Sequence, residues 1–153
     1  DVWALASVQE EVTFAGAYTS TFEIRPTIAV ALDVTFGKGT GANDHTAFPL
    51  GKGITLGVGA SIHPFLHKRF KEVADRVEIP VVSEAVPGAS YTDADAMQLT
   101  AEGIPTMVLS IPLRYMHTPV EVVAIKDIQR AGRLLAEFIS SLEEDFIEKI
   151  VWE

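Results

Sequence analysis

The sequence has no cysteine, so it can form neither disulfide bonds nor thiolate metal sites. Proteins without disulfides are typical of the cytoplasm, and a cytoplasmic location is expected. No apolar run approaches the ~20 residues of a membrane span, so no membrane partner is expected. Basic residues are also scarce, with 12 Lys and Arg against 21 Asp and Glu and a net charge of −9. Because such a surface repels phosphate backbones, nucleic acid is not expected as a partner.

What the chain does contain is enough apolar material for one folded domain. It has 153 residues, of which 48% are hydrophobic, and chains of this size bury roughly 70% of their unfolded surface. The sequence opens at Asp1, directly before a predicted core strand and without an initiator methionine. We therefore expect residues 1–153 to be a single domain that belongs to a longer chain.

Apolar runs alternate with amphipathic stretches along the sequence. Runs typical of buried strands lie at 2–8, 26–32, 54–58, 79–85 and 105–111. Patterns typical of helices lie at 15–22, 61–77, 92–103 and 127–147. The resulting order is strand, helix, strand, strand, helix, strand, helix, strand, helix. It predicts an α/β fold, a three-layer α/β/α sandwich around a mostly parallel mixed sheet.

Three of the predicted strands are followed by side chains that can bind metal. Glu10 and Glu11 come directly after the first strand, and Asp33 ends the second. His117 follows the last strand. The carboxyl ends of strands in an α/β sheet are where ligands collect. Three carboxylates and an imidazole suit Zn²⁺, Co²⁺ or Mn²⁺, and one of two adjacent acids can remain unligated and act as a general base.

Several of these patterns also have a purely structural interpretation. Paired glutamates at the start of a helix complement the helix dipole. His63 and His67 have the i, i+4 spacing of metal ligands, but no third ligand is nearby and flanking basic residues would repel a cation. We therefore favour a structural role for both histidines. Residues 44–45, an Asp-His pair in a polar stretch, are more typical of a surface loop than of a metal site.

Six short motifs occur in an order that matches a known family. They are Ser7–Val12, Ala31–Thr35, Leu50–Gly53, Thr92–Ala94, Gly103–Thr106 and Arg114–Pro119. Together they resemble the TET-type dinuclear metallo-aminopeptidases, a family that also carries glutamyl-aminopeptidase and cellulase or endoglucanase labels. The match spans nearly the whole chain. It implies a zinc-peptidase-like fold of which this chain is the C-terminal part of the catalytic domain, without the β domain that such enzymes insert.

The resemblance also implies a role for each candidate residue. Glu10 would be the general base in a reaction of a metal-activated water with the first peptide bond. Glu11, Asp33 and His117 would be ligands in a site for two divalent metal ions, with zinc or cobalt expected. A substrate-binding or supporting role would fall to four further residues, Thr92, Asp93, Arg114 and Tyr115. Thr92 fits a helix cap equally well.

The family site needs two further ligands, a histidine and a bridging aspartate, from sequence ahead of the Glu-Glu strand. Nothing in this chain matches them. Two cations ~3.5 Å apart without a shared anion would repel each other. We therefore expect the isolated chain to bind metal weakly, as a single ion, and to be inactive. In the complete enzyme the resemblance implies peptide substrates and a homo-oligomer.

Two alternatives to an aminopeptidase remain at this stage. The chain could be a non-catalytic fragment or assembly subunit, which the missing ligands favour. A glycoside hydrolase would need two carboxyl groups about 5 Å or about 6.5–9.5 Å apart across a sugar. Glu10 could form such a pair with Glu11 or Asp33, but His117 would then have no role.

Overall fold

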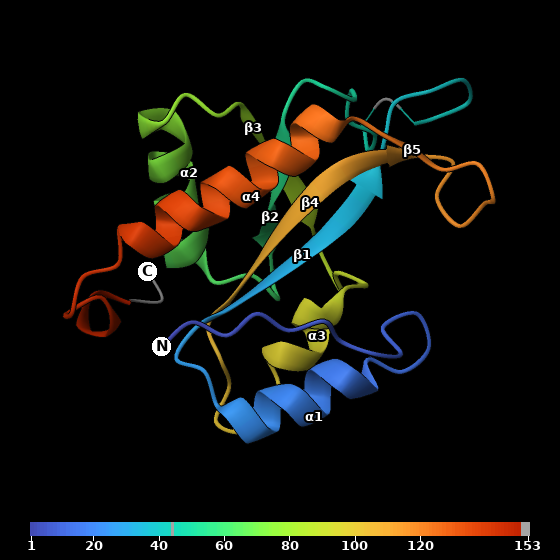
Figure 1. Cartoon of the computed structure of the whole chain (residues 1–153). Helices are drawn as coiled ribbons and strands as arrows, with labels where there is room; N and C mark the ends of the chain where they lie inside the picture. The colour runs from blue at the N-terminus through green and yellow to red at the C-terminus, as the bar shows by residue number, and fades with distance from the viewer. Residues whose placement is uncertain (44, 151–153) are drawn as a thin grey trace.

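The structure is a computed structural model that describes residues 1–43 and 45–150; Asp44, one of the residues assigned above to a surface loop, lies outside them. Within these residues the strands are β1 (Ala29–Phe36), β2 (Ile54–Gly59), β3 (Val81–Val86), β4 (Thr106–Arg114) and β5 (Val122–Val123). The helices are α1 (Ala15–Ile24), α2 (Pro64–Arg76), α3 (Asp93–Met97) and α4 (Ile125–Ser140), followed by a 3-10 turn at Ile147–Lys149 (Figure 1).

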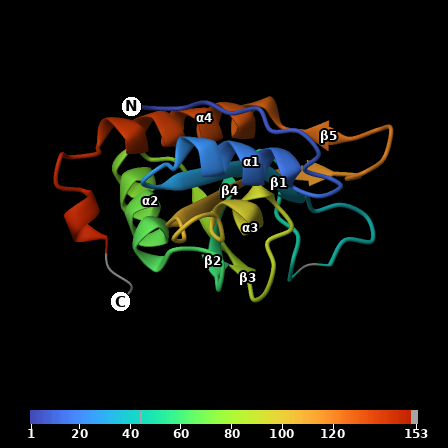
Figure 2. The same cartoon turned by 90° about the horizontal axis from the view of Figure 1, so that it is seen from below.

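All five strands belong to one mixed sheet with the order β1-β4-β2-β3, and β5 pairs with β4. The β1–β4 and β2–β3 pairs are parallel, whereas β2–β4 and β4–β5 are antiparallel. Helices α2 and α4 cover one face of the sheet, and α1 and α3 lie on the other (Figures 1 and 2). The predicted three-layer α/β/α sandwich is confirmed.

The pairing register gives the two faces of the sheet different chemistry, because alternate strand residues point to opposite faces. Toward α2 and α4 the strands present buried apolar side chains such as Leu56, Met107 and Leu109. This layer is closed by Phe70 of α2 and Phe138 of α4, whose rings stack 3.9 Å apart. Toward α3 the same strands present polar residues, namely Asp33, Thr35, Thr55, Glu84 and Ser110.

Helix α2 follows closely from its sequence. Pro64 occupies its first turn, where a missing backbone N–H is tolerated. Its buried residues are Leu66, Phe70, Val73 and Ala74, which form the apolar stripe expected of a surface helix. His63 is the buried N-terminal flanking residue, and its backbone N–H donates to the Thr106 carbonyl at 2.9 Å.

Several element boundaries differ from the prediction, among them the C-terminal ends of α4, α3 and β4. Helix α4 ends at Ser140 rather than Ile147, since the acidic run at 143–145 would oppose the negative C-terminal end of a helix dipole. Helix α3 ends at Met97, well before Gly103. Strand β4 continues through Pro112 to Arg114, because pairing with β2 covers only Leu109 and Ser110 and leaves Pro112 beside β1 alone.

The prediction of a buried strand at residues 2–8 is wrong. The segment has no regular structure, and Val2 and Trp3 are each 69% exposed. A buried strand needs a partner strand and a second covering layer, and apolar composition alone does not show whether either is present. Among the described residues, β1 pairs only with β4, so its outer edge has no ladder partner. No helix in this part of the chain is long and apolar enough to cross a membrane.

Candidate active site

A tight turn places the glutamate pair at the rim of the sheet. Gln9 begins it with a positive φ of 61°, and its carbonyl accepts the backbone N–H groups of Val12, Thr13 and Phe14. The turn leaves Glu10 partly buried and Glu11 exposed. Because the chain has left extended geometry, the two adjacent side chains are not forced to opposite faces.

His117 meets this turn from the loop that follows β4. Its Nε2 lies 3.3 Å from Oε1 of Glu11, and both side chains are largely exposed. The backbone N–H of His117 donates to the Glu121 carboxylate at 2.7 Å, which fixes the loop where its φ is positive. Two residues 106 positions apart in the sequence therefore lie in direct contact.

Asp33 lies within β1 rather than at its end, three residues before Phe36. Its carboxylate accepts the backbone N–H of Val34 at 2.7 Å. Partial burial raises the pKa of Asp33 above its usual value, and the negative charges of Asp93 and Glu11 raise it further. Asp33, Asp93 and Glu11 are therefore close enough for their negative charges to repel one another.

Asp93 joins the N-terminal segment to α3. Its Oδ2 accepts the Ser7 hydroxyl at 2.5 Å, while Oδ1 is buried and has no hydrogen-bond partner among the described residues. The preceding Thr92 is a helix cap, accepting the backbone N–H of Ala94 at 3.2 Å. No role for Ser7 follows from the sequence, because the contact joins residues 86 positions apart and no local pattern signals it.

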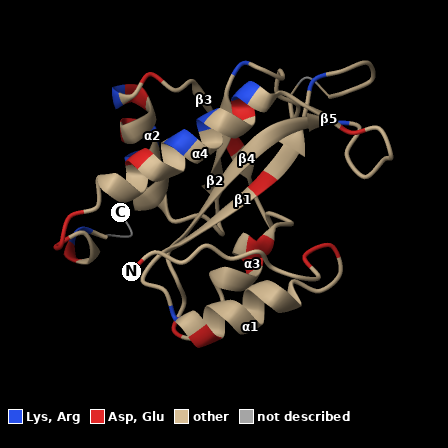
Figure 3. Ribbon diagram, viewed as in Figure 1, with Lys and Arg blue, Asp and Glu red and all other residues tan. Residues whose placement is uncertain are grey.

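The acidic residues form one electrostatic cluster on this side of the molecule. Figure 3 shows acidic ribbon on β1, on α3 and in the loop between the N-terminal segment and α1. Partial burial raises the pKa of Glu10 above its usual value, and three carboxylates raise it further, those of Asp33, Glu11 and Asp93. The positive charge that His117 can carry acts in the opposite direction. A carboxyl group with a raised pKa is suited to proton transfer near neutral pH.

Within residues 1–43 and 45–150 the candidate ligands do not form a complete metal site. Among the described residues, no group of three or more His, Asp and Glu side chains is arranged to hold a metal ion. The structure brings Glu11 and His117 into contact and keeps Glu10 and Asp33 within electrostatic range. Carboxylates and an imidazole are suitable ligands for a divalent cation, and a bound cation would offset the repulsion between the carboxylates.

Arg114 and Tyr115, also candidates from the sequence, lie at the end of β4 and directly after it. The Nε of Arg114 donates to the Lys38 carbonyl, so Arg114 ties the end of β4 to the loop after β1. Tyr115 is 54% exposed. Their expected role beside the substrate stays a prediction.

The two other histidines considered above have structural surroundings. His63 is buried beside β4, and burial lowers its pKa. The Nε2 of His67 lies 3.1 Å from the Ser83 hydroxyl. Its pKa is lowered by burial and then by the charge on Lys71, which favours a neutral ring.

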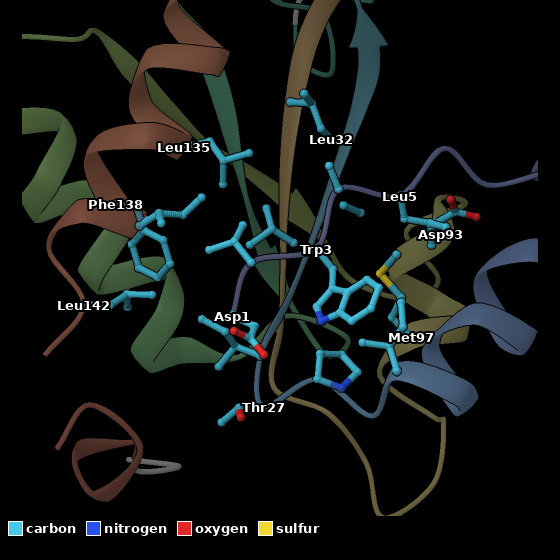
Figure 4. Close-up of a pocket in the computed structure, with 18 of the residues that line it drawn as sticks. Asp1, Trp3, Leu5, Thr27, Leu32, Asp93, Met97, Leu135, Phe138 and Leu142 are labelled. Atoms are coloured by element: carbon cyan, nitrogen blue, oxygen red, sulfur yellow. The ribbon is translucent and has the colours of Figure 1, made fainter. Parts of the chain in front are cut away.

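A groove of about 960 Å³ runs beside the cluster, between the N-terminal segment, β1, α3 and α4. Figure 4 shows Trp3, Leu5 and Met97 on one side of it and Leu135 and Phe138 on the other. The lining is mainly apolar. Two acidic residues of the cluster, Asp33 and Asp93, also line it, so the groove opens onto the candidate active site.

Replacement of Asp33 by asparagine is expected to stabilise the chain in metal-free buffer. The folded-state pKa of Asp33 is raised, so its charged form destabilises the fold above that pKa, and the effect disappears as the pH falls toward the unfolded value of about 3.9. Thermal unfolding in chelator should give Asp33→Asn a Tm a few degrees above the unmodified chain at pH 7.5. At pH 4 the difference should nearly vanish.

The matched control is Asp75→Asn, a substitution at an exposed position of α2. It should leave Tm unchanged at both pH values. An Asp33→Asn variant that is no more stable than the unmodified chain at pH 7.5 would contradict the proposed repulsion within the cluster.

Comparison with known proteins gives a consistent result. The family model described as M42 glutamyl aminopeptidase matches residues 1–134. The chain is 40% identical over 143 residues to a lysyl aminopeptidase of Pyrococcus furiosus, covering 94% of this chain and 41% of that protein. The chain thus spans about two-fifths of the length of this curated relative.

Solved structures show the same similarity. One is the TET aminopeptidase of a Thaumarchaeota archaeon, with a TM-score of 0.88 at 31% identity, covering 95% of this chain and 42% of that one. Another is the TET1 peptidase of Pyrococcus horikoshii, described as assembling into a tetrahedron or a large octahedral shell. It has a TM-score of 0.72 at 26% identity and covers 89% of this chain and 40% of that one.

Proposed function

The chain belongs to the M42 glutamyl aminopeptidase family, and from this membership we propose that it supplies part of the active site of a metal-dependent aminopeptidase that removes N-terminal residues from peptides. The observation that carries the proposal is the cluster at the rim of the sheet. There, separate segments of the chain bring Glu10, Glu11 and Asp33 within electrostatic range of one another, and His117 lies in contact with Glu11 and within range of Glu10.

Glu10 is proposed as the general base. Of the two adjacent glutamates, Glu10 is the partly buried one with a raised pKa, whereas Glu11 is exposed and in contact with His117. A carboxylate so placed takes a proton from the attacking water and returns it to the leaving amine. The neighbouring negative charges favour the protonated state that this step produces.

Glu11, Asp33 and His117 are proposed as ligands in a site for two divalent metal ions, with zinc or cobalt expected. When bound, such ions lower the pKa of a water molecule and polarise the substrate carbonyl. This chain supplies carboxylate and imidazole donors of the right chemistry. Since the described residues form no complete ligand set, the remaining ligands would have to come from outside them.

The complete product of the reading frame that encodes this chain should hydrolyse aminoacyl 4-nitroanilides. Chelator treatment should abolish that activity, and added Zn²⁺ or Co²⁺ should restore it. The 153-residue chain alone should release no nitroaniline and should bind Zn²⁺ weakly in calorimetry, with about one ion per chain, because its ligand set is incomplete.

Three results would contradict the proposal. Full activity in the presence of chelator would show that the reaction needs no metal ion. Hydrolysis of cellulose in place of peptides would favour the glycosidase alternative. A complete product that hydrolyses no anilide under any metal condition would leave the chain as a structural or assembly subunit. The assembly of the TET1 peptidase is a property of that protein; a homo-oligomer and a cytoplasmic location stay proposals for this one.

A further inference from the structure

A second acidic residue lies on the same face of the sheet as Asp33. Glu84 of β3 is partly buried, and both of its carboxylate oxygens accept hydroxyl groups. Thr35 of β1 donates to Oε1 and Thr55 of β2 donates to Oε2, each at 2.5 Å. The carboxylate is thus fixed from two different strands. Both threonines are themselves buried.

This carboxylate has no cationic partner in the described part of the chain. No Lys, Arg or His side chain there forms an ion pair with Glu84, and the hydroxyl groups of two threonines carry no charge. A partly buried carboxylate that is oriented but not neutralised is suited to bind a cation that comes from outside the protein.

The position of Glu84 relates it to the candidate active site. Asp33 and Thr35 are two residues apart on β1, so they share a face and are separated by about 7 Å along the strand. Thr35 in turn contacts Glu84. The two acidic residues Asp33 and Glu84 therefore lie on one face of the sheet and are linked through Thr35.

We propose that Glu84 is a specificity-determining residue that receives a positively charged side chain on the N-terminal residue of the substrate. The inference rests on the proposed aminopeptidase function. A lysyl side chain carries its ammonium group on a flexible four-carbon stem and can donate three hydrogen bonds. Norleucine has the same stem without the charge, so comparing the two isolates the contribution of Glu84.

Binding can be tested on the 153-residue chain without activity. In ¹⁵N-¹H NMR spectra, L-lysinamide should shift the amide signals of Thr35, Thr55 and Glu84, and L-norleucinamide should not. The Glu84→Gln variant, which has almost the same shape, should lose the lysinamide response. Equal responses to both amides, or no response of these three signals to lysinamide, would overturn the assignment.

Kinetics on the complete product supply an independent readout. Glu84→Gln should lower kcat/KM for lysyl 4-nitroanilide by roughly 10- to 100-fold, the effect of losing a hydrogen bond to a charged group, and change leucyl 4-nitroanilide less than about threefold. Glu84→Asp, which keeps the charge, should retain a preference for lysyl substrate. The control Glu23→Gln, at an exposed position of α1, should change neither value.

The outcomes separate the two proposals. If the unmodified complete product hydrolyses neither anilide, the aminopeptidase proposal itself fails. If it hydrolyses both and Glu84→Gln lowers both equally, only the assignment of Glu84 fails, and its contacts with Thr35 and Thr55 serve the sheet alone. If Glu84→Gln does not fold, the lysinamide titration of the unmodified chain still decides the assignment.

Discussion

Replacement of Asp127 by alanine is expected to lower the free energy of unfolding by roughly 3–5 kcal/mol, the typical effect of removing one partner of a buried ion pair. Asp127 of α4 is completely buried. Its carboxylate accepts the backbone N–H groups of Gly51 and Gly53 at 2.5 and 3.2 Å and Nη1 of Arg130 at 2.8 Å. Alanine would leave all three donors without this acceptor.

The loss should be visible as a lower midpoint in urea unfolding followed by circular dichroism, with little change in slope. Asp127→Asn should have a smaller effect, since its side-chain oxygen can still accept a hydrogen bond. Asp75→Ala, at an exposed site, should stay within about 0.5 kcal/mol of the unmodified chain. An Asp127→Ala variant as stable as this control would show that Asp127 does not anchor the Gly51–Gly53 turn.

The largest expected effect on activity comes from Glu10→Gln in the complete product. Because glutamine cannot take a proton from water, kcat should fall by about 10²–10⁴-fold, the usual contribution of a general base. KM should change little, since the substitution conserves volume and leaves Glu11, Asp33 and His117 in place. The measurement is hydrolysis of an aminoacyl 4-nitroanilide at saturating Zn²⁺ or Co²⁺.

The pH dependence gives a second check on the same residue. Glu10 acts as a base only when deprotonated, so kcat/KM should rise as the pH increases through its pKa, which burial and neighbouring carboxylates raise. In Glu10→Gln that rise should be absent from the residual activity. Glu23→Gln should keep the full rate and the same profile. A Glu10→Gln enzyme within fivefold of the unmodified rate would assign the proton transfer to another group.

The layers of the fold could be predicted from the sequence because each one has a local signal. The stripe that includes Leu66, Val73 and Ala74 has helical periodicity, and Pro64 marks where that helix begins. In α4, whose sequence also has an amphipathic pattern, Ala131, Leu134 and Phe138 are buried, whereas the apolar Ile128 is 46% exposed. Periodicity identifies a face but does not show how far the neighbouring layer extends.

The segment at residues 2–8 shows where sequence patterns are insufficient. Its composition is that of a buried strand. Burial, however, also requires a neighbouring strand and covering layers, and the sequence of the segment alone does not show whether these are present. The same limit applies to Pro112. Proline predicts the end of a strand, but β4 continues past it because the neighbouring β2 has already separated.

The sequence nominates residue types for the candidate site but does not predict their contacts. Adjacent glutamates at Glu10 and Glu11, and motifs in family order, were enough to nominate the side chains. Asp33 was expected at the end of a strand, but it lies inside β1. The contact between Ser7 and Asp93 and the two threonines on Glu84 are long-range hydrogen bonds, for which no spacing in the sequence is diagnostic.

The outer edge of β1, which has no strand partner in the part of the chain that the structure describes, has a consequence for purification and storage. Main-chain groups along that edge offer another molecule a template for strand addition, and Leu32 and Phe36 beside them are 50% and 61% exposed. Self-association would grow with protein concentration and would be countered by the net charge of −9, which salt screens. Dilute, low-salt buffer at neutral pH is therefore the condition under which the chain should remain monodisperse.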